Sequence, residues 1–453
     1  MTKTLLDYYR VPLELQPLAS TADPSGDAGF FQFGADAICF GRCKSGVSAK
    51  VDGSPLPDAS KDIRASAAGM QLPCDISEAI DNLRRERYLA APEAGNQRWM
   101  NNALVREAYY VLRGMLPTSF RHSLQRRYLS DWKELKFPRW PVEFAVDALH
   151  EAQLRLSMEA SGMQKVPFIW FWPDGAPSCL ILTHDVETKA GRDFTPTLMD
   201  MDADHGLRAS FQVIPEERYE VPADYLQEIR ARGFEVNVHD LNHDGRLFQE
   251  RQEFLRRAGK INEYVKKFGA RGFRAGAMYH NADWYDAFEF SYDMSIANVA
   301  HMEPQRGGCC TVMPFFIGDI VELPLTATQD YSLLHMLQME TIDLWKQQIS
   351  LLKRRNGLIS FVSHPDYLID KKNRAIYVAL LSYIQETVSR EKIWAPLPGE
   401  VDRWWRARSQ MRLVRKGSEW EIEGPERSRA CVAYAVIADG GLACEIERAS
   451  VRA

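Results

Sequence analysis

The sequence predicts an α/β protein built around a parallel sheet or a (β/α) barrel. Two observations indicate this fold. Between about residue 165 and residue 405, short apolar segments with strand character alternate with helical segments. Polar and ionisable side chains directly follow several of the expected strands, which is typical of a site at the carboxyl ends of parallel strands. We expect strands at 179–183, 208–213 and 234–239, and helices at 195–206 and 223–232.

The sequence on either side of this region has a different character. Residues 1–165 are expected to form an accessory region, irregular to about residue 75 and mainly helical afterwards, with apolar residues at helical spacing in 101–116 and 142–158. The barrel itself is expected at 166–408. The last part, 409–453, predicts a small β-rich tail, in which two strands are joined by a turn at 439–441.

Composition excludes several classes of partner. The 453 residues are 45% hydrophobic and 26% charged, as in ordinary globular proteins, and the net charge of −5 indicates neither nucleic acid nor an anionic membrane. The start of the chain has no apolar stretch typical of a signal peptide, and no run reaches the roughly 18 apolar residues of a membrane span. The spacing of the eight cysteines fits no disulfide framework or zinc ribbon, so we expect reduced thiols in a cytoplasmic protein.

An acidic cluster ends the first strand of the expected barrel. The apolar run that begins at Cys179 leads into His184, Asp185 and Glu187. Charged groups at the end of a buried strand usually line a site, because ions in a core are costly unless they are paired or bind a metal. If the strand continues through these residues, alternation sends Asp185 and Glu187 to the same side.

Two histidines follow a later strand. Residues 234–238 alternate apolar and polar side chains, which predicts a half-buried strand with His239 at its end. If the chain then turns helically, the spacing of four residues places the imidazoles of His239 and His243 on one face. Neutral imidazole binds zinc, nickel, cobalt or ferrous iron. The alternative is a pair of surface histidines in a polar loop.

Two further segments follow the same pattern. In 272–276, Arg274 comes directly after an aromatic residue, and the apolar run 358–363 ends at His364. The chain order is therefore an acidic pair, a histidine pair, an arginine and a final histidine, and the later members each follow an expected strand.

These motifs resemble the polysaccharide deacetylase (NodB-homology, carbohydrate esterase 4) family over roughly residues 165–405. Residues 183–187 resemble the first family motif, usually Thr-Phe-Asp-Asp-Gly, and 239–243 resemble the second, His-x-x-x-His. Residues 273–274 are similar to the start of the third motif, 292–293 lie where the fourth is expected, and His364 resembles the fifth.

The resemblance implies a distorted (β/α) barrel with fewer than eight complete units and a metal-dependent hydrolase that removes N-acetyl groups. Asp185 corresponds to the catalytic base, and Arg274 to the residue that orients this base and keeps it ionised. His239 and His243 correspond to metal ligands, with Glu187 as our candidate for the third, and His364 corresponds to the general acid. One divalent metal is expected, with zinc ahead of cobalt, nickel or iron. The expected substrate is an N-acetylated sugar, oligosaccharide or lipid-linked glycan.

The sequence also departs from the family pattern. Val186 replaces the usual second Asp, which is a metal ligand, and Gly276 stands where Pro is usual. His184 replaces an apolar residue, and we favour a structural role for it. Tyr279, Trp284 and Asp293 are the candidate substrate-binding residues. The two aromatics either line a sugar groove or pack in the core, and Asp293 supports either the arginine or a backbone turn.

Two other functions stay open. Relatives on this fold hydrolyse small linear amides and ureides, and the altered first and third motifs could reshape the pocket for such a substrate. Val186 also leaves open a catalytically inactive carbohydrate-binding protein without a metal. Each site residue has a structural alternative as well: Asp185 as a helix cap, Glu187 as an exposed carboxylate, Arg274 in a salt bridge and His364 as a buried, hydrogen-bonded histidine.

Overall fold

The structure, a computed structural model, describes residues 3–12, 19–20, 26–66, 69–90, 125–127, 129–438 and 441–447. The chain divides into two units. Unit 1 contains Met1–Ala91, Phe144–Pro177 and Arg403–Ala453, and unit 2 contains Pro92–Glu143 and Ser178–Asp402. The expected helix at 101–116 and the centre of the expected turn at 439–441 lie outside the described residues.

Unit 2 is built on an eight-stranded sheet. The strand order is β12-β13-β11-β10-β9-β8-β7-β14, in which neighbours are parallel except for the antiparallel pair β12–β13. The strands are β7 (Cys179–Val186), β8 (Ala209–Val213), β9 (Glu235–His239), β10 (Gly272–Arg274), β11 (Tyr292–Asp293), β12 (Phe315–Ile317), β13 (Ile320–Glu322) and β14 (Leu358–Ser363).

A segment without regular strand structure connects the two sides of this sheet. Ala297 bridges to Leu325, and the next residues reach β14. There the Ala327 amide donates to the Ser360 carbonyl at 3.1 Å, and the Ser360 amide donates to Thr326 Oγ1 at 2.9 Å. The result is a distorted (β/α) barrel, which confirms the predicted fold class.

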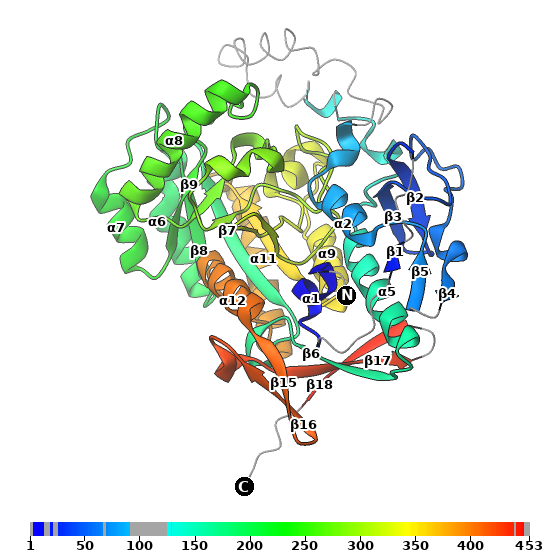
Figure 1. The fold of residues 1–453 in the computed structure, drawn as a ribbon. Helices are drawn as coiled ribbons and strands as arrows, with labels where there is room; N and C mark the ends of the chain where they lie inside the picture. The colour runs from blue at the N-terminus through cyan, green and yellow to red at the C-terminus, as the bar shows by residue number, and fades with distance from the viewer. Residues whose placement is uncertain are drawn as a thin grey trace. The chain divides into compact units, whose positions relative to one another are not determined.

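Helices cover the outside of the strands, and α6, α7 and α8 lie beside β7, β8 and β9 (Figure 1). Their ends follow local signals: Thr188 caps α6 by accepting from the Gly191 amide at 3.1 Å, and Gly269 ends α8 in a left-handed conformation.

No α-helix of eight or more residues follows β10 or β11 among the described residues, so the barrel has fewer than eight complete units. The α-helices of this unit are α6 (Lys189–Asp204), α7 (Ala223–Ala231), α8 (Arg251–Phe268), α9 (Asp343–Arg354), α10 (Pro365–Leu368) and α11 (Lys371–Glu391), and α12 (Pro398–Gln410) runs across the unit boundary.

Unit 1 assembles segments that are distant in sequence. Its sheet β18-β17-β6 is antiparallel, and β2 and β3 form a separate antiparallel pair. The pairing of β17 with β18 confirms the two strands expected in the tail. Its strands are β1 (Ala19–Ser20), β2 (Gly29–Phe33), β3 (Ala37–Gly41), β4 (Arg64–Ser66), β5 (Gly69–Leu72), β6 (Lys165–Ile169), β15 (Arg412–Lys416), β16 (Glu419–Glu423), β17 (Val432–Ala438) and β18 (Gly441–Ile446), and its helices are α1 (Lys3–Tyr9), α2 (Ile76–Arg84) and α5 (Ala145–Ala160).

The position of β6 differs from the sequence-based boundary. The pattern predicts that the barrel begins near residue 166, whereas Lys165–Ile169 pairs with Val432–Ala438 in unit 1. An apolar run shows that a strand is buried but does not show which strand it pairs with. The partner of β6 lies more than 250 residues away, and the boundary therefore depends on tertiary pairing.

Candidate metal centre

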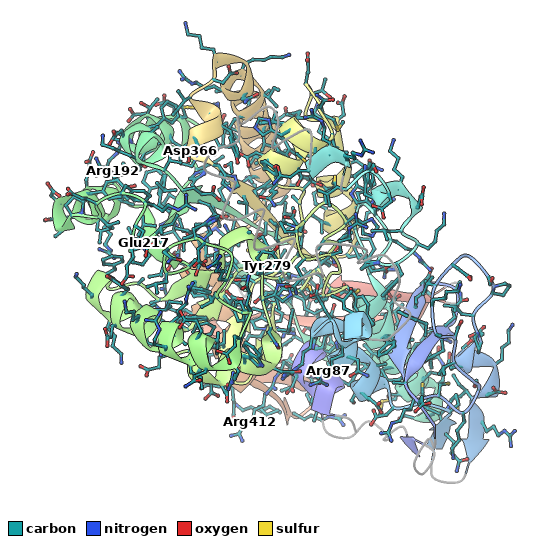
Figure 2. The ribbon with its side chains drawn as sticks, turned by 90° about the horizontal axis from the view of Figure 1, so that it is seen from above. Arg87, Arg192, Glu217, Tyr279, Asp366 and Arg412 are labelled. Carbon is teal, nitrogen blue, oxygen red and sulfur yellow. The ribbon has the colours of Figure 1, made fainter. Side chains whose placement is uncertain are left out.

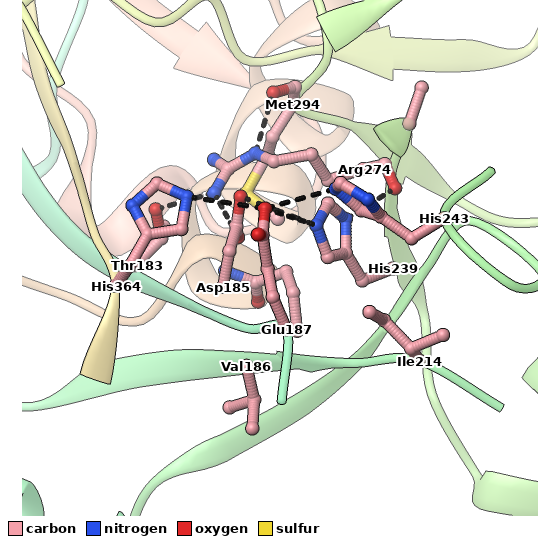
Figure 3. Close-up of polar contacts among 12 residues, drawn as sticks. Thr183, Asp185, Val186, Glu187, Ile214, His239, His243, Arg274, Met294 and His364 are labelled. Carbon is pink, nitrogen blue, oxygen red and sulfur yellow. Dashed lines mark hydrogen bonds and ion pairs between the residues drawn. The ribbon is translucent and has the colours of Figure 1, made fainter. Parts of the chain in front are cut away.

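Strand β7 brings two carboxylates to the end of the barrel. Side chains alternate along the strand, so Thr183 and Asp185 face inward while His184 and Val186 face outward. Glu187 follows the strand on the same side as Asp185, and Val186 points away from both (Figure 3). The absence of a carboxylate at position 186 therefore does not remove a side chain from this cluster.

The backbone between His239 and His243 adopts a conformation that differs from a helical turn. No helical turn joins His239 to His243, so the condition under which the spacing of four residues would place both rings on one helix face is not met. Instead, Asp240 and His243 adopt left-handed backbone conformations with φ of 55° and 56°, and Asp240 Oδ1 accepts from the Leu241 amide at 2.7 Å. Short polar side chains favour such local turns over a helix. The two imidazole rings still lie close together, with 4.8 Å between their centroids.

Three ligand atoms converge between these elements. One atom each from Glu187, His239 and His243 lies within 4.8 Å of the others. His243 Nε2 is 3.0 Å from Glu187 Oε1, and His239 Nε2 is 3.9 Å from the same oxygen. Ligands about 2.1 Å from a tetrahedral metal are themselves about 3.4 Å apart, so a small adjustment would allow them to share one cation.

Two observations test whether this group fits a metal. His239 Nδ1 lies 3.0 Å from the Arg274 carbonyl oxygen, which can only accept, so Nδ1 carries a proton and Nε2 is the nitrogen that would bind a metal. In addition, Nε2 of His239 and Nε2 of His243 are buried, and neither forms a hydrogen bond of acceptable geometry among the described residues, although Glu187 Oε1 lies near both. Buried nitrogens of this kind usually have a partner, so the group fits a divalent cation.

Charge within the cluster keeps both carboxylates ionised. Burial alone would raise the pKa of Glu187, but His243 and the other nearby imidazoles hold it well below its usual value. Burial likewise opposes ionisation of Asp185, and the charges of Arg274 and His239 lower the pKa of Asp185 nevertheless. Two carboxylates, one facing imidazoles and one facing a guanidinium, are therefore available.

Arg274 is fixed in the barrel interior by three acceptors, two on β7 and one directly after β11. Its Nη1 donates to Asp185 Oδ1 and to Thr183 Oγ1, each at 2.8 Å, and its Nε donates to the Met294 carbonyl at 2.9 Å (Figure 3). The side chain is completely buried. A buried cation held at several points gives Asp185 a defined orientation and a stable counter-charge.

His364 lies on the other side of the carboxylates from the two histidines (Figure 3). Its Nε2 is 3.6 Å from Glu187 Oε1, and its Nδ1 lies 2.7 Å from Asp330 Oδ1. Asp330 Oδ2 also accepts from the His364 backbone amide at 2.7 Å. Burial would lower the pKa of His364, but the carboxylate of Asp330 raises it well above its usual value.

Asp330 was not among the residues that sequence reasoning selected. It follows the barrel-closing segment 325–327, which has no regular strand pattern, and it lies 34 residues from His364 in the chain. The available signal is the change from the mainly apolar segment 320–325 to the mainly polar segment 326–330, which resembles the other strand ends.

The candidate substrate-binding residues are not all brought to this cluster. Asp293 is in register with Phe273, so it faces the same side as that ring and away from Arg274. It is fully buried and accepts from Tyr285 Oη at 2.7 Å and from Ser295 Oγ at 2.6 Å. The geometry therefore does not place Asp293 in contact with Arg274.

The two aromatic candidates differ in their surroundings. Trp284, in the 3₁₀ helix η6 (Ala282–Ala287), packs on Phe254 with 5.2 Å between ring centroids, and the Arg251 guanidinium lies 5.2 Å from its ring. Trp284 thus belongs to an aromatic cluster on α8. Tyr279 directly follows η5 (Gly276–Met278) and is half-buried (Figure 2). A substrate-binding role for Tyr279 stays a prediction.

His184 takes part in a buried network on the outer face of β7. Its Nδ1 lies 2.9 Å from Ser363 Oγ, and its Nε2 lies 2.8 Å from Asp202 Oδ2. Tyr377 donates to the other oxygen of Asp202 at 2.7 Å. Both ring nitrogens are used, so His184 connects β7, β14 and α6 and contributes no ligand.

Comparison with known proteins gives structural likenesses of low sequence identity. No protein-family model and no curated protein sequence matches the chain. A protein from Mycobacterium smegmatis that is described as a polysaccharide deacetylase has a TM-score of 0.42 and 17% identity, covering 55% of this chain and 98% of that one. A family 4 carbohydrate esterase from Streptomyces lividans has a TM-score of 0.32 and 11% identity, with 49% and 93% covered. A peptidoglycan deacetylase from Bacillus subtilis has a TM-score of 0.33 and 11% identity, with 51% and 93% covered.

Similar folds host different activities, so the chemistry of this chain depends on its own side chains. Among the described residues, no helix combines the length and the apolar character that a membrane span requires. Unit 2 is a distorted (β/α) barrel, and its motifs lie in the order and at the strand ends implied by the resemblance to the polysaccharide deacetylase family.

Proposed function

We propose that this protein is a metal-dependent hydrolase that removes N-acetyl groups from a saccharide or glycoconjugate. The observation that carries the proposal is the convergence of Glu187, His239 and His243 next to an ionised, arginine-bound Asp185 and a carboxylate-bound His364. A metal site, a base and an acid together are what amide hydrolysis at neutral pH requires.

The two imidazoles and Glu187 would hold the metal. Nitrogen and carboxylate ligands suit zinc, and cobalt, nickel and iron accept the same set. When bound, such a metal supplies a Lewis acid that polarises the oxygen atoms of water and of an amide carbonyl. Three protein ligands leave coordination positions open, which distinguishes a catalytic set from a closed structural one.

In this proposal, Asp185 takes a proton from the attacking water. One of its oxygens accepts from Arg274 at 2.8 Å, and the other faces His239 Nε2 at 3.7 Å, on the side of the ligand cluster. Because Arg274 lowers the pKa of Asp185, the carboxylate is ionised and ready to accept a proton. The buried guanidinium also restricts the rotation of the base.

In this proposal, His364 gives a proton to the departing nitrogen. Asp330 accepts from Nδ1 and leaves Nε2 directed towards Glu187 Oε1, 3.6 Å away. The same carboxylate raises the pKa of His364, so the ring keeps its proton until the amine leaves. An amine that leaves unprotonated is a poor leaving group, and the step therefore depends on this acid.

The N-acetylated sugar is the substrate class that the family resemblance implies. The same residues would also hydrolyse a small linear amide, which is the second candidate. Acetate release from N-acetylglucosamine oligomers, measured in parallel with hydrolysis of an N-alkylacetamide, separates the two substrates. Faster turnover of the N-alkylacetamide would contradict the sugar assignment while leaving the metal site in place.

Metal analysis of His239→Ala and His243→Ala tests the site itself. We expect about one equivalent of divalent metal in the wild-type protein and a large loss in both variants, because other residues cannot replace a lost ligand. His205→Ala is the matched control, since His205 lies at the end of α6 and contacts Met201 and Ser382 instead. Unchanged metal content in the two site variants would contradict the metal assignment. Metal without acetate release from either substrate would favour a binding protein.

A further inference from the structure

Two cysteines of unit 1 lie opposite each other across a β-bridge. Cys43, which follows β3, and Cys74, which precedes α2, are antiparallel bridge partners. The next residues form a hydrogen bond, in which the Lys44 amide donates to the Pro73 carbonyl at 2.9 Å. This pattern makes Cys43 and Cys74 a non-hydrogen-bonded pair.

The backbone geometry at such a pair suits a disulfide. Opposite residues at non-hydrogen-bonded positions have Cα atoms about 4.5 Å apart and side chains directed at each other. Disulfides span Cα separations of about 4.4–6.8 Å. The two sulfurs could therefore bond without a large movement of either backbone segment. Most pairs of cysteines in a folded protein are too far apart to do so.

The surroundings give the two thiols different reactivity. Cys74 is 2% exposed, whereas Cys43 is half-buried and open to a small reagent. Hydrogen bonding to the Cys74 thiol lowers the pKa of Cys43 to about 7, despite partial burial. The same contact, together with burial, raises the pKa of Cys74. Cys43 thus has the thiolate character of an attacking sulfur, and Cys74 is the protected partner.

A metal site is the main alternative for neighbouring thiols. Cys39 lies on β3, four residues before Cys43, and is buried. However, the cysteines of this region do not converge as ligands: over the part of the chain that the structure describes, the group of three or more potential ligands is Glu187, His239 and His243. Two thiols in contact without further ligands fit a covalent pair better than a metal.

We propose that Cys43 and Cys74 are a thiol–disulfide pair that is oxidised by a small-molecule disulfide such as oxidised glutathione. The Cys43 thiolate attacks one sulfur of the oxidant, its S–S bond breaks, and one glutathione leaves and takes up a proton. Cys74 then loses its proton and attacks Cys43 Sγ, which forms the protein disulfide and releases the second glutathione. Two cysteines lose two electrons and two protons, and one oxidised glutathione becomes two reduced molecules.

The new bond would link two elements that already pack together. The guanidinium of Arg42, the residue before Cys43, contacts the carboxylate of Glu78, which lies on α2 four residues after Cys74, at 3.2 Å. The bond closes the loop 44–73, which contains β4 and β5. Cross-linking restricts the unfolded chain, so the oxidised form should melt at a higher temperature than the reduced form.

Peptide mass spectrometry tests the pair in the full chain. The reduced protein is treated with oxidised glutathione, alkylated under denaturing conditions and digested. We expect a linked peptide that contains Cys43 and Cys74 and has lost two hydrogen atoms. Recovery of both cysteines in alkylated form, or a link between Cys43 and Cys39, would overturn the proposal.

Three variants locate the attacking thiol. Cys74→Ala should accumulate glutathione on Cys43, and Cys43→Ala should leave Cys74 unmodified because it is buried. Cys39→Ala is the matched control and should still form the link. Glutathione on Cys74 of Cys43→Ala would contradict the order of the steps. The wild-type result needs no variant, so a variant that fails to fold does not weaken the test.

Discussion

At the scale of single residues, two neighbouring carboxylates have different environments. Asp185 is 3% exposed and is bound to Arg274, whereas the Glu187 side chain is 22% exposed and faces His239, His243 and His364. A base and a metal ligand need this difference, because a carboxylate that coordinates a metal ion uses the lone pair that a base needs for the proton. The geometry thus supports Asp185 as the base and Glu187 as the ligand.

Substitution of each carboxylate should separate these roles. We expect Asp185→Asn to keep the metal and to lose turnover by about 10²-fold or more, since the amide cannot accept the proton. Glu187→Gln should instead weaken metal affinity by about 10-fold or more. Metal titration and steady-state kinetics measure both effects. Metal lost from Asp185→Asn but kept in Glu187→Gln would exchange the two assignments.

Asp330 is a positioning residue for His364, and its substitution tests the proposed acid. In Asp330→Asn the imidazole loses the carboxylate that raises its pKa and fixes its orientation. We expect kcat to fall by about 10-fold or more, with KM and metal content nearly unchanged. An unchanged kcat would reject the pairing as part of catalysis. A loss of metal would show that the pair supports the ligand cluster instead.

Glu322 gives a residue-scale prediction outside the metal centre. Burial, followed by the nearby Asp293 charge, raises the pKa of Glu322 well above its usual value. Above about pH 4.5 the Glu322 carboxyl is therefore still protonated in the native state, whereas it loses its proton in the unfolded chain. The free energy of unfolding is consequently highest below this pH, and it falls as the pH rises towards the native pKa of Glu322. Glu322→Gln cannot ionise. When the pH is raised from about 5.5 to about 8.5, the Tm of Glu322→Gln should therefore rise relative to the Tm of the wild-type protein. A difference that does not change with pH would contradict the raised pKa.

At the scale of elements, the loop after β9 and the turn after β10 form the histidine pair together. The loop positions His243 through left-handed residues, and the turn leaves room for the ring at Gly276. A Cβ at position 276 would lie 2.5 Å from Asp240 Oδ2 and 3.0 Å from His243 Cδ2. Gly276, which stands where the family usually has proline, is therefore explained by the close approach of Asp240 and His243, which leaves no space for a side chain.

Gly276→Ala should consequently weaken metal binding. The added methyl group must displace Asp240 or the His243 ring, and we expect metal affinity to fall by about 10-fold or more, because a ligand must be held in place. Gly259→Ala is the matched control, since a Cβ there meets nothing within 4 Å and the residue lies inside α8. We expect this control to keep its metal and to be as stable as the wild type or slightly more so. Equal metal affinity in the two variants would contradict the close contact at Gly276.

At the scale of the whole molecule, the proposed metal site would take its ligands from the residue after β7, from the end of β9 and from the loop that follows β9, which the fold of unit 2 brings together. The unfolded chain has no such cluster, so a metal that binds the native state should stabilise that state.

Removal of the metal with a chelator should lower the Tm of the wild-type protein. At a free metal concentration 100 times Kd, binding contributes about 2.7 kcal/mol to stability, and this contribution is lost on removal. Differential scanning calorimetry with and without chelator measures the shift, and re-addition of zinc should reverse it. His243→Ala should show little response. An equal response in that variant would mean that the chelator acts elsewhere.

The sequence by itself determined the features that depend on local periodicity. Apolar runs and alternation place β7, β9 and β14 and predict that Asp185 and Glu187 share one side, because side-chain direction along a strand follows from chain geometry alone. Motif order then indicates the family resemblance. The tertiary structure decided what depends on distant parts of the chain: Asp330 reaches His364 through a segment with no strand pattern, Asp293 faces away from Arg274 because of its register, and β6 joins unit 1. Register, barrel closure and strand partners are set by long-range pairing, which leaves no trace in the residues of one segment.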